Sequence, residues 1–186
     1  MAPEKNDAGT NGEKTHTLSL LVENKPAVLH RISGLFSRRG YNIESLAVGP
    51  TERPAYSRMT IVVRLEAKPV DQVIRQVQKL VPVVEVKELP PHDYVERELL
   101  LVKIKTPERN HAELRAIADT YEAQIVDVSP DALMIEATGT AAKLDALEER
   151  LGTYGIQELC RSGRIALERG FKTLAPPHLK EHAPAE

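Results

Sequence analysis

Apolar and polar residues alternate along several short stretches of the chain, which is the pattern of β-strands with one buried face. In the first stretch, Leu18, Leu20 and Val22 fall on the same face of the predicted strand. The pattern predicts four strands in the first half of the chain, at residues 15–23, 41–49, 57–65 and 83–89.

Two intervals between these strands carry apolar residues at the spacing of a helix with one buried face. The buried stripe of the first helix is predicted to be Val28, Ile32, Leu35 and Phe36. We expect the second helix to begin at Pro69 and to bury Val70, Val73, Ile74, Val77 and Leu80. Asn24 or Lys25 is predicted to cap the first helix, and Gly40 to end it. Pro26 would then lie in the first turn, where a missing N–H costs nothing.

The same order of elements, βαββαβ, recurs in the second half of the chain. Strands are predicted at residues 98–105, 124–128, 132–138 and 156–160, with a short continuation at 165–167. Helices are predicted at residues 108–121 and after Thr140, which is expected to act as a cap. Pro90, Pro91 and His92 form a stiff linker between the halves, since consecutive prolines favour an extended backbone.

These elements predict an α+β protein with two tandem ferredoxin-like βαββαβ domains. The predicted division is a disordered tail at 1–14, a first domain at 15–89, a linker at 90–94, a second domain at 95–170 and a flexible tail at 171–186. Helices should cover only one face of each sheet. The opposite face carries apolar residues at alternate positions and requires a cover or a partner, so we predict a homodimer.

Composition narrows the class of protein without identifying a chemistry. The chain has 186 residues, of which 41% are hydrophobic and 28% charged, and a net charge of −2, so no basic excess points to nucleic acid or to an anionic membrane. The single cysteine, Cys160, excludes an internal disulfide and fits a reducing cytoplasm. No apolar run resembles a signal peptide or a membrane span. We therefore expect a cytoplasmic protein.

Catalytic signatures are missing from the sequence. There is no nucleophile elbow, phosphate-binding loop, zinc-protease motif or dinucleotide-binding glycine pattern, and the six histidines are scattered. We predict no catalytic residue and no metal site. RNA-recognition motifs share the βαββαβ order and stack bases on aromatic residues of their first and third strands. The corresponding strands here contain no aromatic residue, so RNA binding is the weaker alternative.

The stretch from Glu23 to Leu46 carries the best candidate for a binding site. A strand ends, a helix begins, and a second strand carrying Asn42 follows the helix. Amides at the helix start favour an anionic group, while Asn24 and Asn42 can hydrogen-bond an ammonium or a carboxylate group. Each asparagine alone also fits a plain structural role, as a cap or a turn residue. Together they suit a zwitterionic small molecule.

Several ordered motifs in this region and beyond it resemble a known family. The turn N-K-P-A-V-L (residues 24–29) resembles the ligand loop of ACT domains, which are small amino-acid-sensing βαββαβ modules. Residues 30–51, H-R-I-S-G-L-F-S-R-R-G-Y-N-I-E-S-L-A-V-G-P-T, are similar to the regulatory small subunit of acetohydroxyacid synthase (acetolactate synthase), as are residues 57–63. Five motifs in the second half add to the resemblance, namely V-E-R-E-L-L-L-V-K-I, I-V-D-V-S-P, E-A-T-G, K-L-D-A-L and R-S-G.

This resemblance implies a regulatory role for the chain. Catalysis would belong to a separate large subunit that uses thiamine diphosphate, magnesium and FAD, and this chain would hold no cofactor. It would bind and activate that subunit and mediate feedback inhibition by valine, or by leucine or isoleucine. Residues 15–89 would be an ACT domain that forms a homodimer. A stand-alone amino-acid sensor acting on another enzyme is the alternative.

Matched position by position, the resemblance implies an effector site at the interface of two ACT domains. The implied effector-binding residues are Asn24, Ala27, Val28, Leu29, Asn42 and Ile43. The two asparagines would bind through their side chains, and residues 27–29 through their backbone amides. Val28, Leu29 and Ile43 would lie beside the branched side chain of the effector. The family usually has glycine where this chain has Ala27, and a methyl group there could crowd the effector and weaken inhibition.

Overall fold

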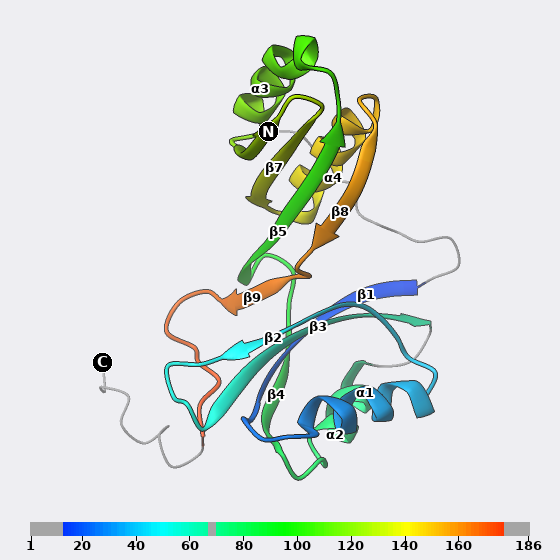
Figure 1. Cartoon of the computed structure of the whole chain (residues 1–186). Coiled ribbons are helices and arrows are strands. Elements are labelled where there is room, and N and C mark those ends of the chain that lie inside the picture. The colour runs from blue at the N-terminus through cyan, green and yellow to red at the C-terminus, as the bar shows by residue number, and fades with distance from the viewer. Residues whose placement is uncertain (1–12, 67–69, 177–186) are drawn as a thin grey trace. The chain divides into compact units, whose positions relative to one another are not determined.

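The computed structural model describes residues 13–66 and 70–176, and the chain divides into two compact units (Figure 1). The first unit contains the residues up to Val95 together with those from Ala166 onward. The second unit is Glu96–Ile165. The chain therefore leaves the first unit, builds the second and returns to the first.

The first unit is a four-stranded antiparallel sheet with two helices on one face (Figure 1). Its elements are β1 (Glu13–Glu23), α1 (Val28–Arg38), β2 (Asn42–Pro50), β3 (Tyr56–Glu66), α2 (Val70–Val77) and β4 (Val83–Leu89). The strand order β2-β3-β1-β4 places β1 and β3 in the centre and leaves β2 and β4 at the edges. This is the order expected for a ferredoxin-like unit.

The second unit repeats this arrangement. Its elements are β5 (Tyr94–Lys105), a 3-10 turn (Glu108–Asn110), α3 (His111–Thr120), β6 (Gln124–Ser129), β7 (Ala132–Gly139), α4 (Ala141–Gly152) and β8 (Ile156–Arg161). The strand order β6-β7-β5-β8 matches that of the first sheet, and a short strand, β9 (Ile165–Glu168), pairs with β5. The predicted fold class, two tandem ferredoxin-like domains, is confirmed.

The apolar stripe predicted for the first helix forms the core of the first unit. Val28, Ile32, Leu35 and Phe36 are all buried, and they pack with alternate residues of β1 and β3. Gly40, at φ 67°, ends the helix as predicted. The N–H of Gly40 donates to Ser37 O and that of Tyr41 to Phe36 O, which satisfies two carbonyls of the last turn. The Tyr41 ring then packs edge-on against Phe36.

The predicted start of this helix was wrong. The helix begins at Val28 with Ala27 at the N-cap position, so neither Asn24 nor Lys25 caps it, and Pro26 precedes it. The cause is a tertiary interaction, because the Asn24 amide donates to Ala55 O at 2.8 Å and so stays with the sheet. Thr140 does cap α4 as predicted, since its hydroxyl accepts from the Lys143 amide.

The structure divides the chain differently from the predicted boundaries near its C-terminal end. Residues 166–170, which we placed in the second domain, group with the first unit. Leu174 and Pro176, which we placed in a flexible tail, are buried. Pro69 and most of the predicted tails lie outside the described residues. Within the described ranges, no helix is both long and apolar enough to cross a membrane.

Candidate effector site

Asn24 lies directly after β1, where the sheet meets the loop before β3. Besides the bond from its own amide to Ala55, its side-chain Nδ2 donates to Pro54 O at 3.0 Å. The residue is exposed. A carboxamide has two donor hydrogens and an acceptor oxygen, so this bond uses only part of its capacity. Asn24 is thus held in place by the protein and can still bind a ligand.

Ala27 has a left-handed backbone conformation, with φ 67° and ψ 2°. For an L-residue with a Cβ this conformation costs about 1–2 kcal/mol, whereas glycine adopts it freely. The family preference for glycine that the resemblance implied at this position therefore has a local physical reason. The alanine methyl group is tolerated here, at the expense of backbone strain.

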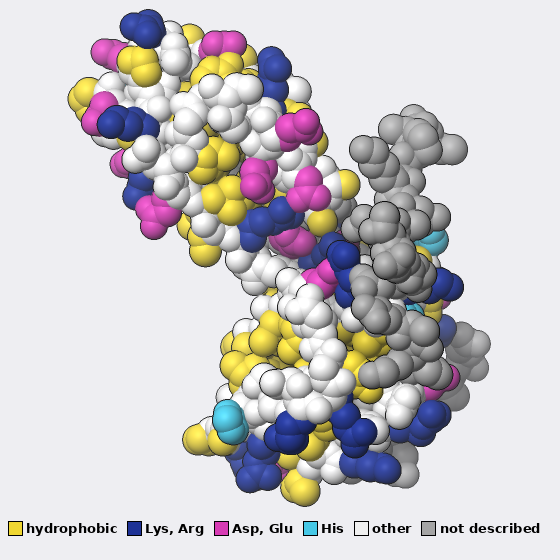
Figure 2. Space-filling model, turned by 90° about the vertical axis from the view of Figure 1, so that its right-hand side faces the viewer, with side chains coloured by type: hydrophobic (Ala, Val, Ile, Leu, Met, Phe, Trp, Pro, Cys, Tyr) yellow, Lys and Arg dark blue, Asp and Glu magenta, His cyan; other side chains and the backbone are white. Residues whose placement is uncertain are grey.

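The helix start at Val28 and Leu29 offers free backbone donors. The first amides of a helix have no carbonyl within the helix to bond, and they lie at the positive end of its dipole. The first turn of α1 contains no acidic residue that would neutralise this end. The helix start therefore favours an anionic group such as a carboxylate. Figure 2 shows lysine and arginine side chains with few acidic ones on one face of the first unit, but this is the side on which α1 ends, so they are no evidence for charge at the helix start.

The side chains of these two residues differ in what they can contact. Val28 is 6% exposed and belongs to the core, so only its amide is available to a ligand. Leu29 is 43% exposed and presents apolar surface beside the helix start. The prediction that both side chains lie beside an effector therefore suits Leu29 better than Val28.

Asn42 and Ile43 begin β2, an edge strand of the sheet. Asn42 is exposed and lies opposite Arg64 of β3, while Ile43 is half-buried and packs against the core. The pairing with β3 shifts between Ile43 and Ser45, which marks a bulge in the strand. Bulges near a strand end commonly redirect side chains at functional sites.

The two asparagines lie at opposite ends of the sheet. Asn24 follows Glu23, which pairs with Tyr56 at the start of β3, whereas Asn42 pairs with Arg64 near its end. Eight residues of an antiparallel strand span about 27 Å. One amino acid therefore cannot contact both asparagines of a single chain. The two residues flank the same helix in the sequence, but they are far apart in the structure.

Comparison with known proteins identifies the family. Residues 18–85 match the description "AHAS small subunit-like ACT domain", and residues 97–170 match "Small subunit of acetolactate synthase". The acetolactate synthase small subunit of Mycolicibacterium smegmatis is 48% identical over 161 residues, covering 87% of this chain and 95% of that protein. This chain belongs to the acetolactate synthase small-subunit family.

Further relatives support the assignment of the acetolactate synthase small-subunit fold to both halves. The probable acetolactate synthase small subunit of Archaeoglobus fulgidus is 48% identical over 157 residues, which cover 84% of this chain and 98% of that one. The crystal structure of the Thermotoga maritima small subunit is 35% identical with a TM-score of 0.79, covering 86% of this chain and 99% of that chain. The family resemblance predicted from the motifs is confirmed, including a regulatory ACT domain.

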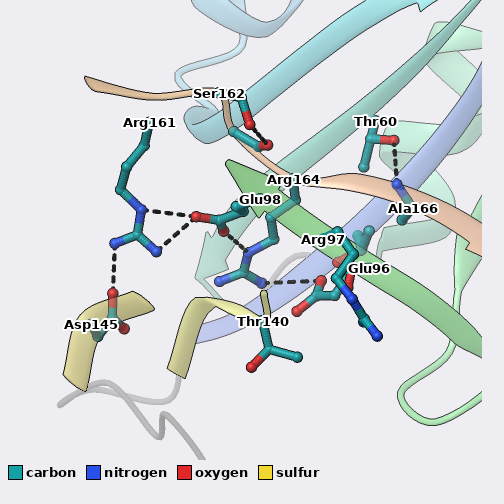
Figure 3. Close-up of polar contacts among 12 residues, drawn as sticks. Thr60, Glu96, Arg97, Glu98, Thr140, Asp145, Arg161, Ser162, Arg164 and Ala166 are labelled. Carbon is teal, nitrogen blue, oxygen red and sulfur yellow. Dashed lines mark hydrogen bonds and ion pairs between the residues drawn. The ribbon is translucent and has the colours of Figure 1, made fainter. Parts of the chain in front are cut away.

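The R-S-G motif of the small-subunit family has a structural partner that the sequence did not reveal. Arg161 and Arg164 flank Glu98, which is 7% exposed, and both donate to its carboxylate (Figure 3). The contacts from Arg161 are 2.7 and 2.9 Å long, and that from Arg164 is 3.2 Å. Burial opposes the charge of Arg161, but its bonds to Asp145 and Glu98 outweigh this and raise its pKa. Sequence reasoning missed this ion-pair cluster because 63 residues separate Glu98 from Arg161.

Replacing Ala27 with glycine should stabilise the protein. Relief of the left-handed strain gains about 1–2 kcal/mol, and the greater freedom of glycine in the unfolded chain offsets about 0.4–1 kcal/mol. We expect a net gain of about 0.5–1 kcal/mol in the free energy of unfolding, measured by urea denaturation. Ala146→Gly, at an exposed position inside α4, is the control and should destabilise by about 1 kcal/mol. A loss of stability in Ala27→Gly would contradict the assigned backbone conformation.

Proposed function

We propose that this chain binds and activates the catalytic subunit of acetolactate synthase and mediates its feedback inhibition by valine, or by leucine or isoleucine. The proposal rests on the helix start at residues 27–29, where free amides, Asn24 and the exposed Leu29 lie together. These groups suit the carboxylate and the branched side chain of such an amino acid. Thiamine diphosphate, magnesium and FAD belong, in this proposal, to the catalytic partner.

The effector site is completed by a second copy of the chain. Among the described strands, β2 has a neighbour, β3, on one side only, and the outer edge of such a strand can pair with the same edge of a second copy about a two-fold axis. Antiparallel pairing centred on Leu46 places Asn42 of the second copy opposite Pro50. Pro50 pairs with Ser57, at the end of β3 where Asn24 lies.

This pairing resolves the separation of the two asparagines. Asn24 and the start of α1 from one chain meet Asn42 and Ile43 from the second copy, and a dimer has two such sites. Binding of the effector at these sites favours one arrangement of the two ACT domains. If that arrangement couples less well to the catalytic subunit, the effector inhibits, with a coupling free energy of about 1–3 kcal/mol.

Reconstitution with the catalytic subunit tests this function. We expect the chain alone to show no acetolactate synthase activity, and its addition to raise the activity of the catalytic subunit. Titration with valine, leucine and isoleucine should then lower that activity, and a bound effector should raise the Tm of this chain. Ala27→Gly in the same assay measures whether the methyl group weakens inhibition.

The outcomes separate the proposal from its alternative. If the chain bound the catalytic subunit tightly without raising its activity, the proposed activating role would be contradicted. Effector binding by a chain that neither binds nor activates the catalytic subunit would favour a stand-alone sensor that acts on another enzyme.

A further inference from the structure

The face of the first sheet that is turned away from the helices is buried. Residues directly opposite in antiparallel strands point to the same face, so the pairing of the four strands defines which side chains lie there. On this face Leu21 is 3% exposed, Val62 0% and Leu89 2%, and none of them belongs to the core under the helices. Buried apolar residues therefore also lie on this face of the sheet, outside the core under the helices, and something must cover them.

Part of this face is covered by a segment from the other end of the chain, residues 166–176, which we call the strap. At the end of the face where Val62 and Leu89 lie, the Tyr94 hydroxyl is 3.3 Å from Thr17 Oγ1. The Ala166 amide donates to Thr60 Oγ1 at 3.2 Å (Figure 3), and Glu168 forms an ion pair with Lys87. The pairing register places Thr60 and Lys87 opposite Ser19, on the face turned away from the helices. The strap therefore begins on the back of the central strands.

The later part of the strap continues over the same face. Arg58 donates to Leu174 O at 3.4 Å, and the Ala175 amide donates to a carboxylate oxygen of Glu85 at 3.3 Å. Arg58 and Glu85 both lie opposite Leu21, at the end of the buried set away from Val62 and Leu89. The four contacts described here between the strap and strands β3 and β4 thus fall on one face of the sheet.

The strap buries its own apolar side chains selectively. Ala166 is 1% exposed and Leu174 5%, whereas Leu167 is 55% exposed and Phe171 fully exposed. Residues 166–168 belong to β9, and they alternate as a strand does, with Ala166 and Glu168 turned toward the first sheet and Leu167 outward. A segment that only trailed in solvent would show no such selection.

We propose that the strap is a cis-acting cover that completes the regulatory domain and closes this face to any other protein. The sheet carries Lys87 and Arg58 where the strap supplies a carboxylate and a carbonyl, and it carries Glu85 where the strap supplies an amide. The surface thus fits an extended segment with the polar groups of residues 166–176. Association with a second copy then uses the edge of the sheet, and the regulatory domain is encoded by two separated parts of the chain.

Zero-length cross-linking of the unmodified full chain tests whether the strap is docked. A carbodiimide joins lysine amines to carboxylates only when they are in contact, so peptide mass spectrometry should detect a Lys87–Glu168 link. The exposed pair Lys103–Glu158, 2.9 Å apart within the second unit, is the internal control. Detection of the Lys103–Glu158 link without the Lys87–Glu168 link would overturn the proposal.

Two substitutions within the strap test its role as a cover. Leu174→Asp should release the strap, lower the Tm by about 5–10 °C and raise the binding of the dye ANS about threefold, because the apolar back of the sheet becomes exposed. Phe171→Ser, three residues earlier at a fully exposed position, should change neither the Tm nor the binding of ANS. Equal behaviour of the two variants would overturn the proposal.

A charge exchange keeps the test decisive if Leu174→Asp fails to fold. Glu168→Lys should abolish the ion pair and raise ANS binding, and the double variant Lys87→Glu, Glu168→Lys should restore the wild-type level. An additive effect of the two substitutions, without restoration, would show that the residues do not meet.

Discussion

Glu98→Gln should lower the free energy of unfolding of the second unit by about 2–4 kcal/mol. The carboxylate of Glu98 is 7% exposed and forms ion pairs with Arg161 and Arg164, whose side chains are 24% and 26% exposed. Asp145 and Glu96 are further acidic partners of these two arginines. Removing one partner of a buried ion pair typically costs about 3–5 kcal/mol, and the partial exposure of the arginines reduces this cost. Urea denaturation followed by circular dichroism measures the effect, with glutamine chosen because it preserves the volume of the side chain.

Glu158→Gln is the matched control for this measurement. Glu158 also pairs with a basic residue of a neighbouring strand, Lys103, at 2.9 Å, but its side chain is 73% exposed. Exposed ion pairs contribute little because water screens them. The midpoint of denaturation should therefore not move in this variant. Equal losses in both variants would show that the burial of Glu98 does not decide its contribution.

Asn24→Ala and Asn42→Ala should each weaken effector binding about 10–100-fold, since a hydrogen bond to a charged group contributes about 1.5–3 kcal/mol. Isothermal titration of valine into the full chain measures this loss. Activation of the catalytic subunit should persist, because both residues are exposed and neither belongs to a core. Asn110→Ala, at the corresponding helix start of the second unit, should leave valine binding unchanged.

Loss of activation would assign a different role to these asparagines. If Asn42→Ala abolished activation together with valine binding, its role would be structural, at the start of the edge strand. Unchanged valine binding in both variants would remove these residues from the proposed effector site.

Periodicity predicted the elements of this fold well because each depends on local spacing. The stripe Val28, Ile32, Leu35 and Phe36 repeats every three or four residues, and all four residues are buried. The strand at Val83–Leu89 has the predicted bounds. The stop at Gly40 was also predictable, because a glycine is needed where the chain turns left-handed after a helix.

Features that depend on distant contacts were not predictable in this way. Asparagine is a common helix cap, but the hydrogen bonds of Asn24 to Pro54 and Ala55, about 30 residues later in the sequence, keep it with the sheet. The end of the strap, residues 171–176, was predicted to be part of a flexible tail, yet Leu174 is buried and the Ala175 amide donates to Glu85 over a separation of 90 residues. Family resemblance supplied the proposed site residues, and the strand register shows that Asn24 and Asn42 of one chain lie too far apart to bind one amino acid. The two-chain site follows from this separation as part of the proposed function.

The shared site is tested most directly by mixing two variants that each bind valine weakly. Co-expressed Asn24→Ala and Asn42→Ala chains assort at random, so half of the dimers contain one chain of each kind. In such a dimer one site carries both substitutions and the other carries neither. Titration of valine should recover about one quarter of the wild-type number of high-affinity sites. Recovery of no sites would contradict the account, because it would place both asparagines in a site formed within one chain.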